Sequence, residues 1–448
     1  MRTIIKNANI INEGEQFIGT LIVNGEDIEQ AIRDGEADHL TTAGDCVIDA
    51  TGLTLIPGVI DDHVHMRDPG LTHKGNMETE TAAAAAGGVT TVFDMPNVNP
   101  QTTTNQLLDE RYALAKGRCH VNYAFFLGAT RDNIQEIRTA DVTRIPGVKL
   151  FMGSSTGNML VDDEEALNQI FAQCPTLIMT HCEDTARINA NMQKAIEQSG
   201  NEDPDVSYHP IVRDEQACLM STELAVRLAK RHGATLHVAH LSTKAEVELL
   251  KNTNDNRITA EACIPHLVYT DEDYAALGTR IKCNPAIKGE KDRQALREAI
   301  VDNTVSVIGT DHAPHLLSEK QGGCRKAVSG MPMLQFSLTG MLQLTDEGVL
   351  SPERVVQLMC HNPASLFKVD KRGFLRPGYK ADFVLLAHES HTVSTDEIQS
   401  LCGWSPREGD TFNWQVKQTW VNGQCAWNGK QLTAPFKGQP VRFNRNKE

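Results

Sequence analysis

Residues 55–70 read LIPGVIDDHVHMRDPG, an apolar segment that runs directly into a cluster of polar side chains. The apolar part, Leu55–Val64, predicts a buried β-strand. Side chains two positions apart in a strand lie on the same face, so His63 and His65 point the same way. Two imidazoles that converge like this can begin a site for a borderline divalent ion such as zinc. Taken alone, the pair is equally typical of a polar strand end with solvated histidines.

The rest of the central region alternates apolar segments with helical stretches such as Glu78–Ala86 and Glu215–His232. Eight buried strands joined by helical crossovers predict an α/β fold, a closed (β/α)8 TIM-type barrel. An open doubly wound sheet is the alternative, but no Gly-x-Gly-x-x-Gly motif follows the first strand. The predicted strands are Leu55–Val64, Thr90–Met95, Val121–Leu127, Val148–Met152, Thr176–Thr180, Thr235–Ala239, Arg257–Ala260 and Ser306–Thr310.

The two ends of the chain share a different texture, with short β-like runs separated by turn residues. Thr20–Val23 lies in the first of these regions, and Asp382–Leu385 lies in the second. Neither end alone holds many strands, so we expect them to pair into one small β-sandwich. The predicted division is residues 1–57 and 369–448 for the sandwich, and residues 58–368 for the catalytic barrel.

Polar residues end several more of the predicted strands. His181 ends the fifth strand, His240 ends the sixth, and Asp311 ends the eighth. A histidine at the end of an apolar strand is usually no more than a tolerated polar residue. In a β/α barrel, however, the chemistry lies where the strands end, and these residues all meet at that rim. The pattern therefore predicts a metal site.

Lys149 lies within the apolar run Gly147–Met152, where burying a free ammonium group costs free energy. The side chain could instead reach water from the strand end. The functional interpretation is that Lys149 reacts with carbon dioxide to form a carbamate. A carbamate is an anion that can bridge two metal ions, and its formation removes the buried positive charge.

These motifs resemble the cyclic amidohydrolases over almost the full chain, and within that superfamily they resemble the dihydroorotases. His63–Gly70 is similar to the metal-and-carboxylate signature of that family. Asp94–Asn97 resembles its substrate-binding turn, and Asp311–His315 resembles its catalytic segment. The match around Asn284 is looser, because the family pattern has a proline where Ala286 stands.

The resemblance implies a metal-dependent hydrolase of de novo pyrimidine biosynthesis, which interconverts (S)-dihydroorotate and N-carbamoyl-L-aspartate. It implies two Zn²⁺ ions per subunit, bridged by carboxylated Lys149 and a hydroxide, with Asp311 as general base and acid. The implied metal ligands are His63, His65, Lys149, His181, His240 and Asp311. The implied substrate contacts are Arg67, Asn97, Asn284 and His315.

Arg67 distinguishes a dihydroorotase from other cyclic amidohydrolases, because a guanidinium can hold the substrate carboxylate with two parallel hydrogen bonds. An allantoinase or dihydropyrimidinase should lack the pair of Arg67 and Asn97, since its substrate carries no ring carboxylate. Arg67 could instead be a surface arginine paired with Asp68, and Asn97 an ordinary turn residue. A metal-free paralogue acting as a scaffold should have lost ligands, and here every ligand position is filled.

The composition of the chain limits which binding partners and which cellular location we expect. A net charge of -15 over 448 residues disfavours a nucleic-acid partner. The sequence has no apolar run long enough to span a membrane and no signal-peptide pattern at its start. Its 11 cysteines include no C-x-x-C pair, which favours a reducing cytoplasm. We expect a homodimer and leave open an association with aspartate transcarbamoylase. Residues 316–330 are typical of a mobile loop near the site, and a lid and an ordinary surface loop both fit this pattern.

Overall fold

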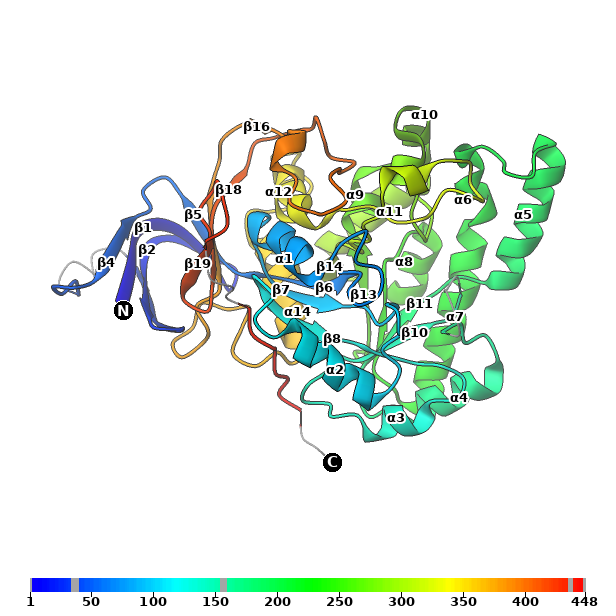
Figure 1. Ribbon diagram of the computed structural model, residues 1–448, viewed down its shortest axis with the longest axis horizontal. Coiled ribbons are helices and arrows are strands. Elements are labelled where there is room, and N and C mark those ends of the chain that lie inside the picture. Colours follow the sequence, from blue (N-terminus) through cyan, green and yellow to red (C-terminus); the bar gives the residue numbers. More distant parts are fainter. Residues whose placement is uncertain (1, 34–39, 154–158, 434–437, 446–448) are drawn as a thin grey trace.

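A barrel of parallel strands forms the centre of the protein, whose computed structural model describes residues 2–33, 40–153, 159–433 and 438–445 (Figure 1). Its wall consists of two parallel sheets, β6-β7-β8 and β9 to β14. The wall closes where the His65 N–H donates to the carbonyl of His312 at 2.8 Å. The predicted (β/α)8 barrel is therefore confirmed. Its third strand consists of two segments, β8, which pairs with β7, and β9, which pairs with β10, so nine segments make the eight strands. The segments are β6 (Val59–Val64), β7 (Val89–Asp94), β8 (Asn122–Phe125), β9 (Leu127–Gly128), β10 (Val148–Phe151), β11 (Ile178–His181), β12 (Leu236–Val238), β13 (Ile258–Cys263) and β14 (Val307–Gly309).

The first predicted strand, Leu55–Val64, is wrong in one respect, because it is two strands. β5 (Thr54–Pro57) pairs within a sheet made by the chain ends, and only β6 belongs to the barrel. Gly58 separates the two. A Cβ atom at Gly58 would lie 2.1 Å from Oγ1 of Thr90, so the close approach of β7 leaves room only for glycine.

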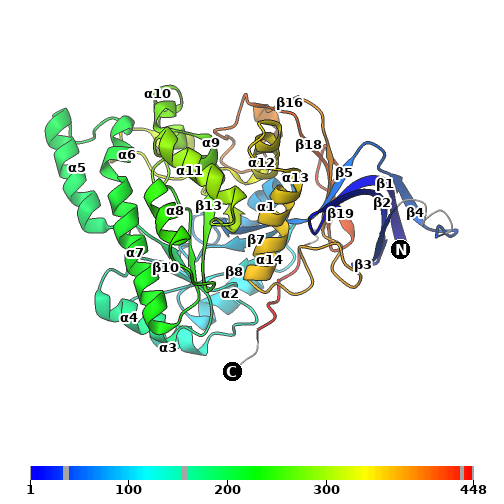
Figure 2. The same cartoon turned by 180° about the vertical axis from the view of Figure 1, so that it is seen from behind.

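Helices cover the outside of the barrel, and α7, α8 and α11 pack side by side on it (Figure 2). The longest of these, α7, begins after Asp214, whose carboxylate accepts the Ala217 N–H at 2.9 Å. It ends at Gly233, which has a φ of 70°. The helices are α1 (Met77–Ala86), α2 (Asn105–Ala115), α3 (Ile134–Thr139), α4 (Glu164–Gln173), α5 (Thr185–Ser199), α6 (His209–Val212), α7 (Glu215–His232), α8 (Lys244–Lys251), α9 (Ile264–Val268), α10 (Tyr274–Leu277), α11 (Glu290–Val301), α12 (Ser337–Asp346), α13 (Pro352–Val356) and α14 (Asn362–Leu366).

Both ends of the chain build one mixed sheet with the strand order β19-β18-β15-β5-β1-β2-β3, and β4 pairs beside β1. The two ends meet where β5 and β15 run antiparallel, with Leu55 opposite Leu385. The strands of this sheet are β1 (Arg2–Asn12), β2 (Glu15–Asn24), β3 (Asp27–Arg33), β4 (Cys46–Asp49), β5, β15 (Phe383–Ala387), β18 (Gln415–Val421) and β19 (Gln424–Trp427).

The terminal sheet folds back on itself and encloses its own apolar core. The Ile28 N–H of β3 donates to the carbonyl of Tyr379 at 2.7 Å, which joins one edge of the sheet to the segment before β15. Inside, the rings of Phe383 and Trp420 stack with centroids 5.2 Å apart. This core is separate from the barrel core, so the prediction of a small β-domain made from both termini is confirmed.

The predicted domain limits, with boundaries after residues 57 and 368, stay a prediction. Part of the predicted second sandwich segment lies along the barrel. The Val441 N–H donates to the carbonyl of Tyr123 at 2.9 Å, and the Phe443 ring meets the edge of Phe93 with centroids 5.5 Å apart. The C-terminal region therefore contributes contacts to the barrel as well as strands to the sheet.

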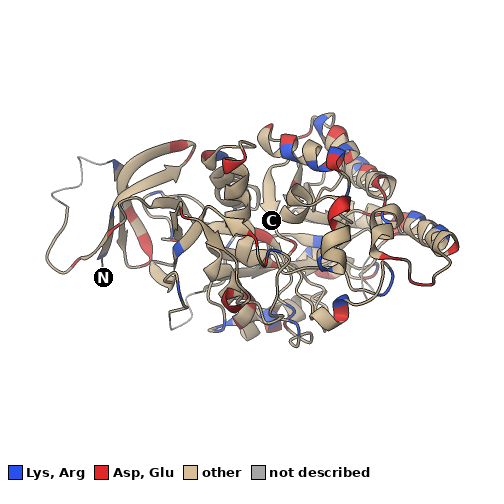
Figure 3. Ribbon diagram, turned by 90° about the horizontal axis from the view of Figure 1, so that it is seen from above, with Lys and Arg blue, Asp and Glu red and all other residues tan. Residues whose placement is uncertain are grey.

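The outer helices carry acidic and basic side chains together (Figure 3). Over the ranges that the structure describes, every helix is too short or too polar to cross a bilayer.

Candidate metal centre and substrate pocket

A cavity of about 1140 Å³ lies at the end of the barrel where the strands terminate in polar residues. It is lined by every residue predicted for the site, although these residues come from widely separated stretches of the chain. Lys74, Arg213 and Lys282 also line it and were not predicted. The predicted residues that line it are His63, His65, Arg67, Asn97, Lys149, His181, His240, Asn284, Asp311 and His315.

The first group of candidate ligands joins the end of β6 to the end of β14. Nε2 of His65 lies 3.0 Å from Oδ1 of Asp311, and Nε2 of His63 lies 3.4 Å from the same oxygen. Burial lowers the pKa of His65 to about 4 and that of His63 to about 3. Both imidazoles are therefore neutral at physiological pH, as metal binding requires.

The second group joins β11 to the residues that follow β12. Nδ1 of His181 lies 2.9 Å from Nε2 of His240, with ring centroids 4.7 Å apart. Burial and the nearby rings of His181 and His63 hold the pKa of His240 well below its ordinary value. Two imidazoles whose ring nitrogens lie this close together fit a divalent cation there.

Lys149 extends from β10 into the same region and is fully buried. Its Nζ has no hydrogen-bond partner among the residues that the structure describes, and it lies 5.3 Å from the centroid of the Phe151 ring. Burial lowers the pKa of Lys149. A buried ammonium with this little support is unfavourable, so the site suits a lysine that loses its charge.

These donors fit a divalent metal ion. Ligand atoms of His63, His240 and Asp311 all lie within 4.8 Å of one another. Imidazole and carboxylate donors are the ligands that zinc and similar borderline ions prefer. Lys149, whose Nζ has no partner among the described residues, lines the same cavity.

Arg67 provides a buried cation in the same pocket. Its Nε donates to the carbonyl of Pro314 at 3.1 Å, and its Nη2 lies 3.0 Å from Nε2 of His315. The alternative of a surface pair with Asp68 is wrong, because Arg67 is 7% exposed and Asp68 pairs with Arg118 at 2.9 Å. Within the described ranges, Arg67 has no carboxylate partner, so its guanidinium is available to an anionic ligand.

Asn97 lies in a turn that the barrel holds firmly. The Asp94 carboxylate at the start of this turn accepts the Met66 N–H at 2.9 Å and pairs with the buried Arg111. Oδ1 of Asn97 lies 2.9 Å from Nδ1 of His65. Because a side-chain carbonyl only accepts, the imidazole donates this bond, and the amide NH₂ of Asn97 is left for a ligand.

His315 and Asn284 leave further polar groups unsatisfied. Nδ1 of His315 lies 3.1 Å from Nζ of Lys74, while its Nε2 faces Arg67. Burial, Arg67 and Lys74 keep the pKa of His315 far below its ordinary value, so the ring is neutral. A neutral imidazole has one acceptor nitrogen and cannot accept from both cations. Oδ1 of Asn284 is also buried without a partner within the described ranges.

The backbone at three of these residues is strained. Arg67, His240 and Asp311 have φ angles of 66°, 37° and 47°. Non-glycine residues rarely adopt positive φ, and such strain clusters at functional sites. Here it occurs at the ends of three strands that supply the pocket.

Comparison with known proteins agrees with this geometry, since residues 54–426 match the family model for the Amidohydrolase family. The chain belongs to the amidohydrolase family. A dihydroorotase of Halobacterium salinarum is 33% identical to it over 417 residues, 91% of this chain and 95% of that protein. A dihydroorotase of Methanosarcina mazei is 32% identical over 419 residues, 90% of each chain.

Solved structures show the same architecture. L-hydantoinase (dihydropyrimidinase) from Arthrobacter aurescens is 28% identical and superimposes with a TM-score of 0.92 over 98% of this chain and 99% of that chain. Dihydropyrimidinase from Brevibacillus agri, at 22% identity and a TM-score of 0.90 over the whole of both chains, shares the fold. This protein is therefore a metal-dependent cyclic amidohydrolase.

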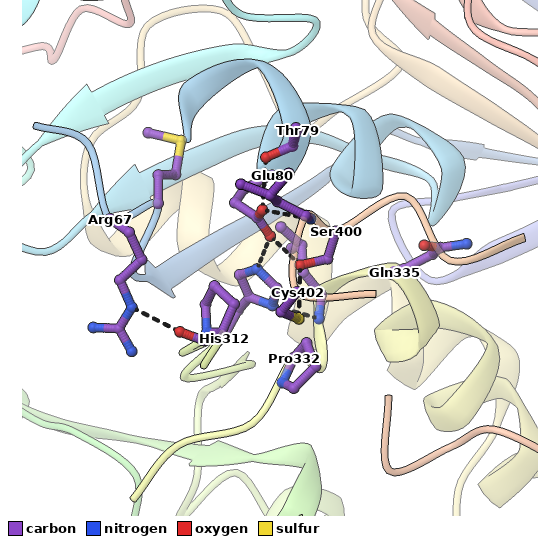
Figure 4. A network of polar contacts seen from close by, with 12 residues as sticks. Arg67, Thr79, Glu80, His312, Pro332, Gln335, Ser400 and Cys402 are labelled. Atoms are coloured by element: carbon purple, nitrogen blue, oxygen red, sulfur yellow. Dashed lines mark hydrogen bonds and ion pairs between the residues drawn. The ribbon is translucent and has the colours of Figure 1, made fainter. Parts of the chain in front are cut away.

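In this amidohydrolase, a buried network fixes the segment after β14. Glu80 of α1 and His312 point toward each other, with 2.7 Å between Oε2 and Nε2 (Figure 4). The Ser400 hydroxyl donates to the same carboxylate oxygen at 2.6 Å, and Nδ1 of His312 accepts the Met333 N–H at 3.2 Å. The backbone beside Asp311 is thus held by three distant parts of the chain.

Sequence reasoning missed the acidic residues that contact the histidines of the amidohydrolase site. Nδ1 of His63 lies 2.5 Å from Oε1 of Glu261, and Nε2 of His181 lies 2.9 Å from Oε2 of Glu183. Glu183 stands two residues after His181, and that proximity was a usable signal. Glu261 lies just beyond the seventh predicted strand, Arg257–Ala260, and nothing local connects it to His63.

The segment predicted as a mobile loop, residues 316–330, is anchored by a buried lysine. Lys320 is 1% exposed, and its ammonium donates to the carbonyls of Lys282, Val328 and Gly330 at 3.0, 2.9 and 2.7 Å. A lid movement stays a prediction, and it would have to break these hydrogen bonds.

Replacing Lys320 with methionine is expected to destabilise the folded protein by roughly 3 kcal/mol, because it leaves three inward-facing carbonyls without a donor. Chemical denaturation followed by circular dichroism measures this loss. Lys326→Met is the matched control, since Lys326 lies in the same segment and is exposed. Equal stability of the two variants would show that the three hydrogen bonds do not hold the segment.

Proposed function

We propose that this amidohydrolase is a dihydroorotase of de novo pyrimidine biosynthesis, which interconverts (S)-dihydroorotate and N-carbamoyl-L-aspartate. The observation that carries the proposal is Arg67, a buried cation in the metal pocket that has no carboxylate partner among the described residues. Dihydroorotate has a carboxylate on its ring and would supply that partner. The relatives from Halobacterium salinarum and Methanosarcina mazei carry the same name.

Three residues would hold the ring carboxylate in place. Arg67 can offer the Nη1 hydrogens that no described residue accepts, and Asn97 can offer its amide NH₂. The neutral ring of His315 faces two cations, Arg67 and Lys74. A carboxylate bound beside these three side chains would offset the two positive charges next to the ring. This grip would orient the ring with its amide bond toward the metal ligands.

We also propose that the site holds two Zn²⁺ ions, bound by His63, His65, His181, His240 and Asp311 and bridged by carboxylated Lys149 and a hydroxide. When bound, such ions lower the pKa of water and polarise a carbonyl group. Carboxylation needs an unprotonated amine, and the lowered pKa of Lys149 increases that fraction. In that reaction the Nζ–carbon bond forms and the amine loses a proton, which leaves a carbamate anion.

Asp311 would move the proton during ring opening. As a candidate metal ligand beside Nε2 of His63 and Nε2 of His65, Asp311 would bind the cation as a carboxylate. The carboxylate is therefore ionised at neutral pH and can accept a proton from the attacking water. It would deliver that proton to the ring nitrogen as the carbon–nitrogen bond breaks.

Three further expectations remain proposals: the homodimer, a cytoplasmic location and an association with aspartate transcarbamoylase. None of them affects the assignment of the reaction.

The activity is tested by parallel turnover assays with dihydroorotate, allantoin, dihydrouracil and hydantoin, with metal content measured on the same sample. We expect efficient turnover of dihydroorotate alone. Turnover of an uncharged ring in preference to dihydroorotate would overturn the substrate assignment and leave the family membership intact.

Replacing Arg67 with methionine is expected to lower kcat/KM for dihydroorotate by about 10²–10³-fold, because a charged, two-bonded contact with the carboxylate is lost. The metal content, measured by elemental analysis, should stay unchanged. Arg325→Met is the matched control, since Arg325 lines the same cavity and is exposed. A variant that keeps wild-type kcat/KM would show that Arg67 does not bind the substrate.

A further inference from the structure

Two buried glutamates contact histidines of the metal centre, one in each group. We propose that Glu261 and Glu183 are positioning residues that decide which ring nitrogen His63 and His181 present to the metal ions. The inference rests on the metal ligands named in the proposed function. It adds two residues that would govern metal affinity without touching a metal.

Glu261 fixes the ring of His63. Its Oε1 lies 2.5 Å from Nδ1 of His63 and accepts the backbone N–H of His240 at 2.9 Å. An oxygen that already accepts from His240 serves as the acceptor for His63 too, so Nδ1 carries the hydrogen. The lone pair of His63 is then on Nε2, which faces Oδ1 of Asp311 at 3.4 Å.

Glu183 fixes the ring of His181 in the opposite sense. Its Oε2 lies 2.9 Å from Nε2 of His181 and pairs with the Arg213 guanidinium, which can only donate. Nε2 of His181 therefore carries the hydrogen. The lone pair is on Nδ1, which lies 2.9 Å from Nε2 of His240.

The two glutamates thus leave the lone pair on Nε2 in His63 and on Nδ1 in His181. Both carboxylates are fully buried, so water does not compete for these hydrogen bonds. Without its glutamate, each imidazole can change tautomer or rotate, and the ligand is no longer held ready for the metal. Carboxylates in this role typically contribute 10- to 100-fold to metal affinity.

The test compares Glu261→Met and Glu183→Met with the wild type, because methionine fills a similar volume and offers no oxygen acceptor. Metal-free protein is titrated with Zn²⁺ against a chromophoric chelator, and native mass spectrometry counts the bound ions. We expect each variant to bind one of the two ions 10- to 100-fold more weakly. Anomalous diffraction should show depletion beside His65 in Glu261→Met and depletion beside His240 in Glu183→Met.

Glu246→Met is the matched control, because Glu246 is buried and bonds to Thr222 and Thr243 instead of a metal ligand. It should bind both ions as the wild type does. Wild-type affinity for both ions in both test variants would overturn the inference, as would equal loss of both ions in each variant.

A second measurement does not depend on the variants folding. Nitrogen-15 chemical shifts of the histidine rings in the metal-free wild type report the tautomers. We expect hydrogen on Nδ1 of His63 and on Nε2 of His181, and the opposite tautomers would overturn the inference. Either result is independent of whether dihydroorotate is the substrate, so a failure of the proposed function can be told apart from a failure of this proposal.

Discussion

Replacing Asp311 with asparagine is expected to reduce kcat for dihydroorotate by about 10³-fold or more, the range of a lost general acid and base. Asparagine has nearly the same shape and keeps an oxygen that can face His63 and His65. It cannot accept a proton at that oxygen near neutral pH. Steady-state assays in both reaction directions measure the loss, which should be similar in each because the same group transfers the proton both ways.

Asp292→Asn is the control for Asp311→Asn. Asp292 is buried, and its carboxylate accepts the Lys244 N–H at 2.9 Å, away from the candidate ligands. This variant should retain kcat. If Asp311→Asn also retained kcat while holding both metals, another group would have to transfer the proton.

Replacing Lys149 with methionine is the second change with a large expected effect. Methionine fills the buried space that the apolar part of the Lys149 side chain occupies, but it cannot react with carbon dioxide. We expect a loss of at least one metal ion per chain and a decrease in kcat of about 10³-fold or more, because the chemistry requires both ions. Elemental analysis and turnover assays on the same preparation measure both effects.

The role of the carbamate has its own check. In Lys149→Ala, a short carboxylic acid such as propionate should enter the vacated space and partly restore metal binding and turnover. Native mass spectrometry of the wild type should show an added carboxyl group on Lys149. Two bound ions on an unmodified Lys149 would contradict the proposal.

The barrel was predictable because its strands are short, fully buried apolar runs with helical patterns between them. The error at Leu55–Val64 has a physical cause. β5 and β6 are both buried, so the apolar pattern continues through them, and only Gly58 marks where the chain passes between sheets. The local sequence indicates whether a strand is buried, but it does not indicate which strand pairs with it.

The same reasoning explains which parts of the site were predictable. Residues that end strands, such as His181 and Asp311, meet at the barrel rim because parallel strands end on one side. Glu261 contacts His63 from 198 positions away. Lys320 binds backbone carbonyl groups, which every residue has, so the residue types do not indicate these contacts. Such contacts follow from the folded path of the chain and could not be read from spacing.

The terminal sheet has a consequence for synthesis on the ribosome. β1 to β5 emerge before the barrel strands, but β5 lacks one of its two neighbours until β15 has been translated, after all the barrel strands. Until then the nascent chain presents the open side of β5, whose backbone groups can pair with any other extended chain. Slow translation or crowded polysomes should therefore favour aggregation through this edge, and molecular chaperones that bind extended segments should suppress it.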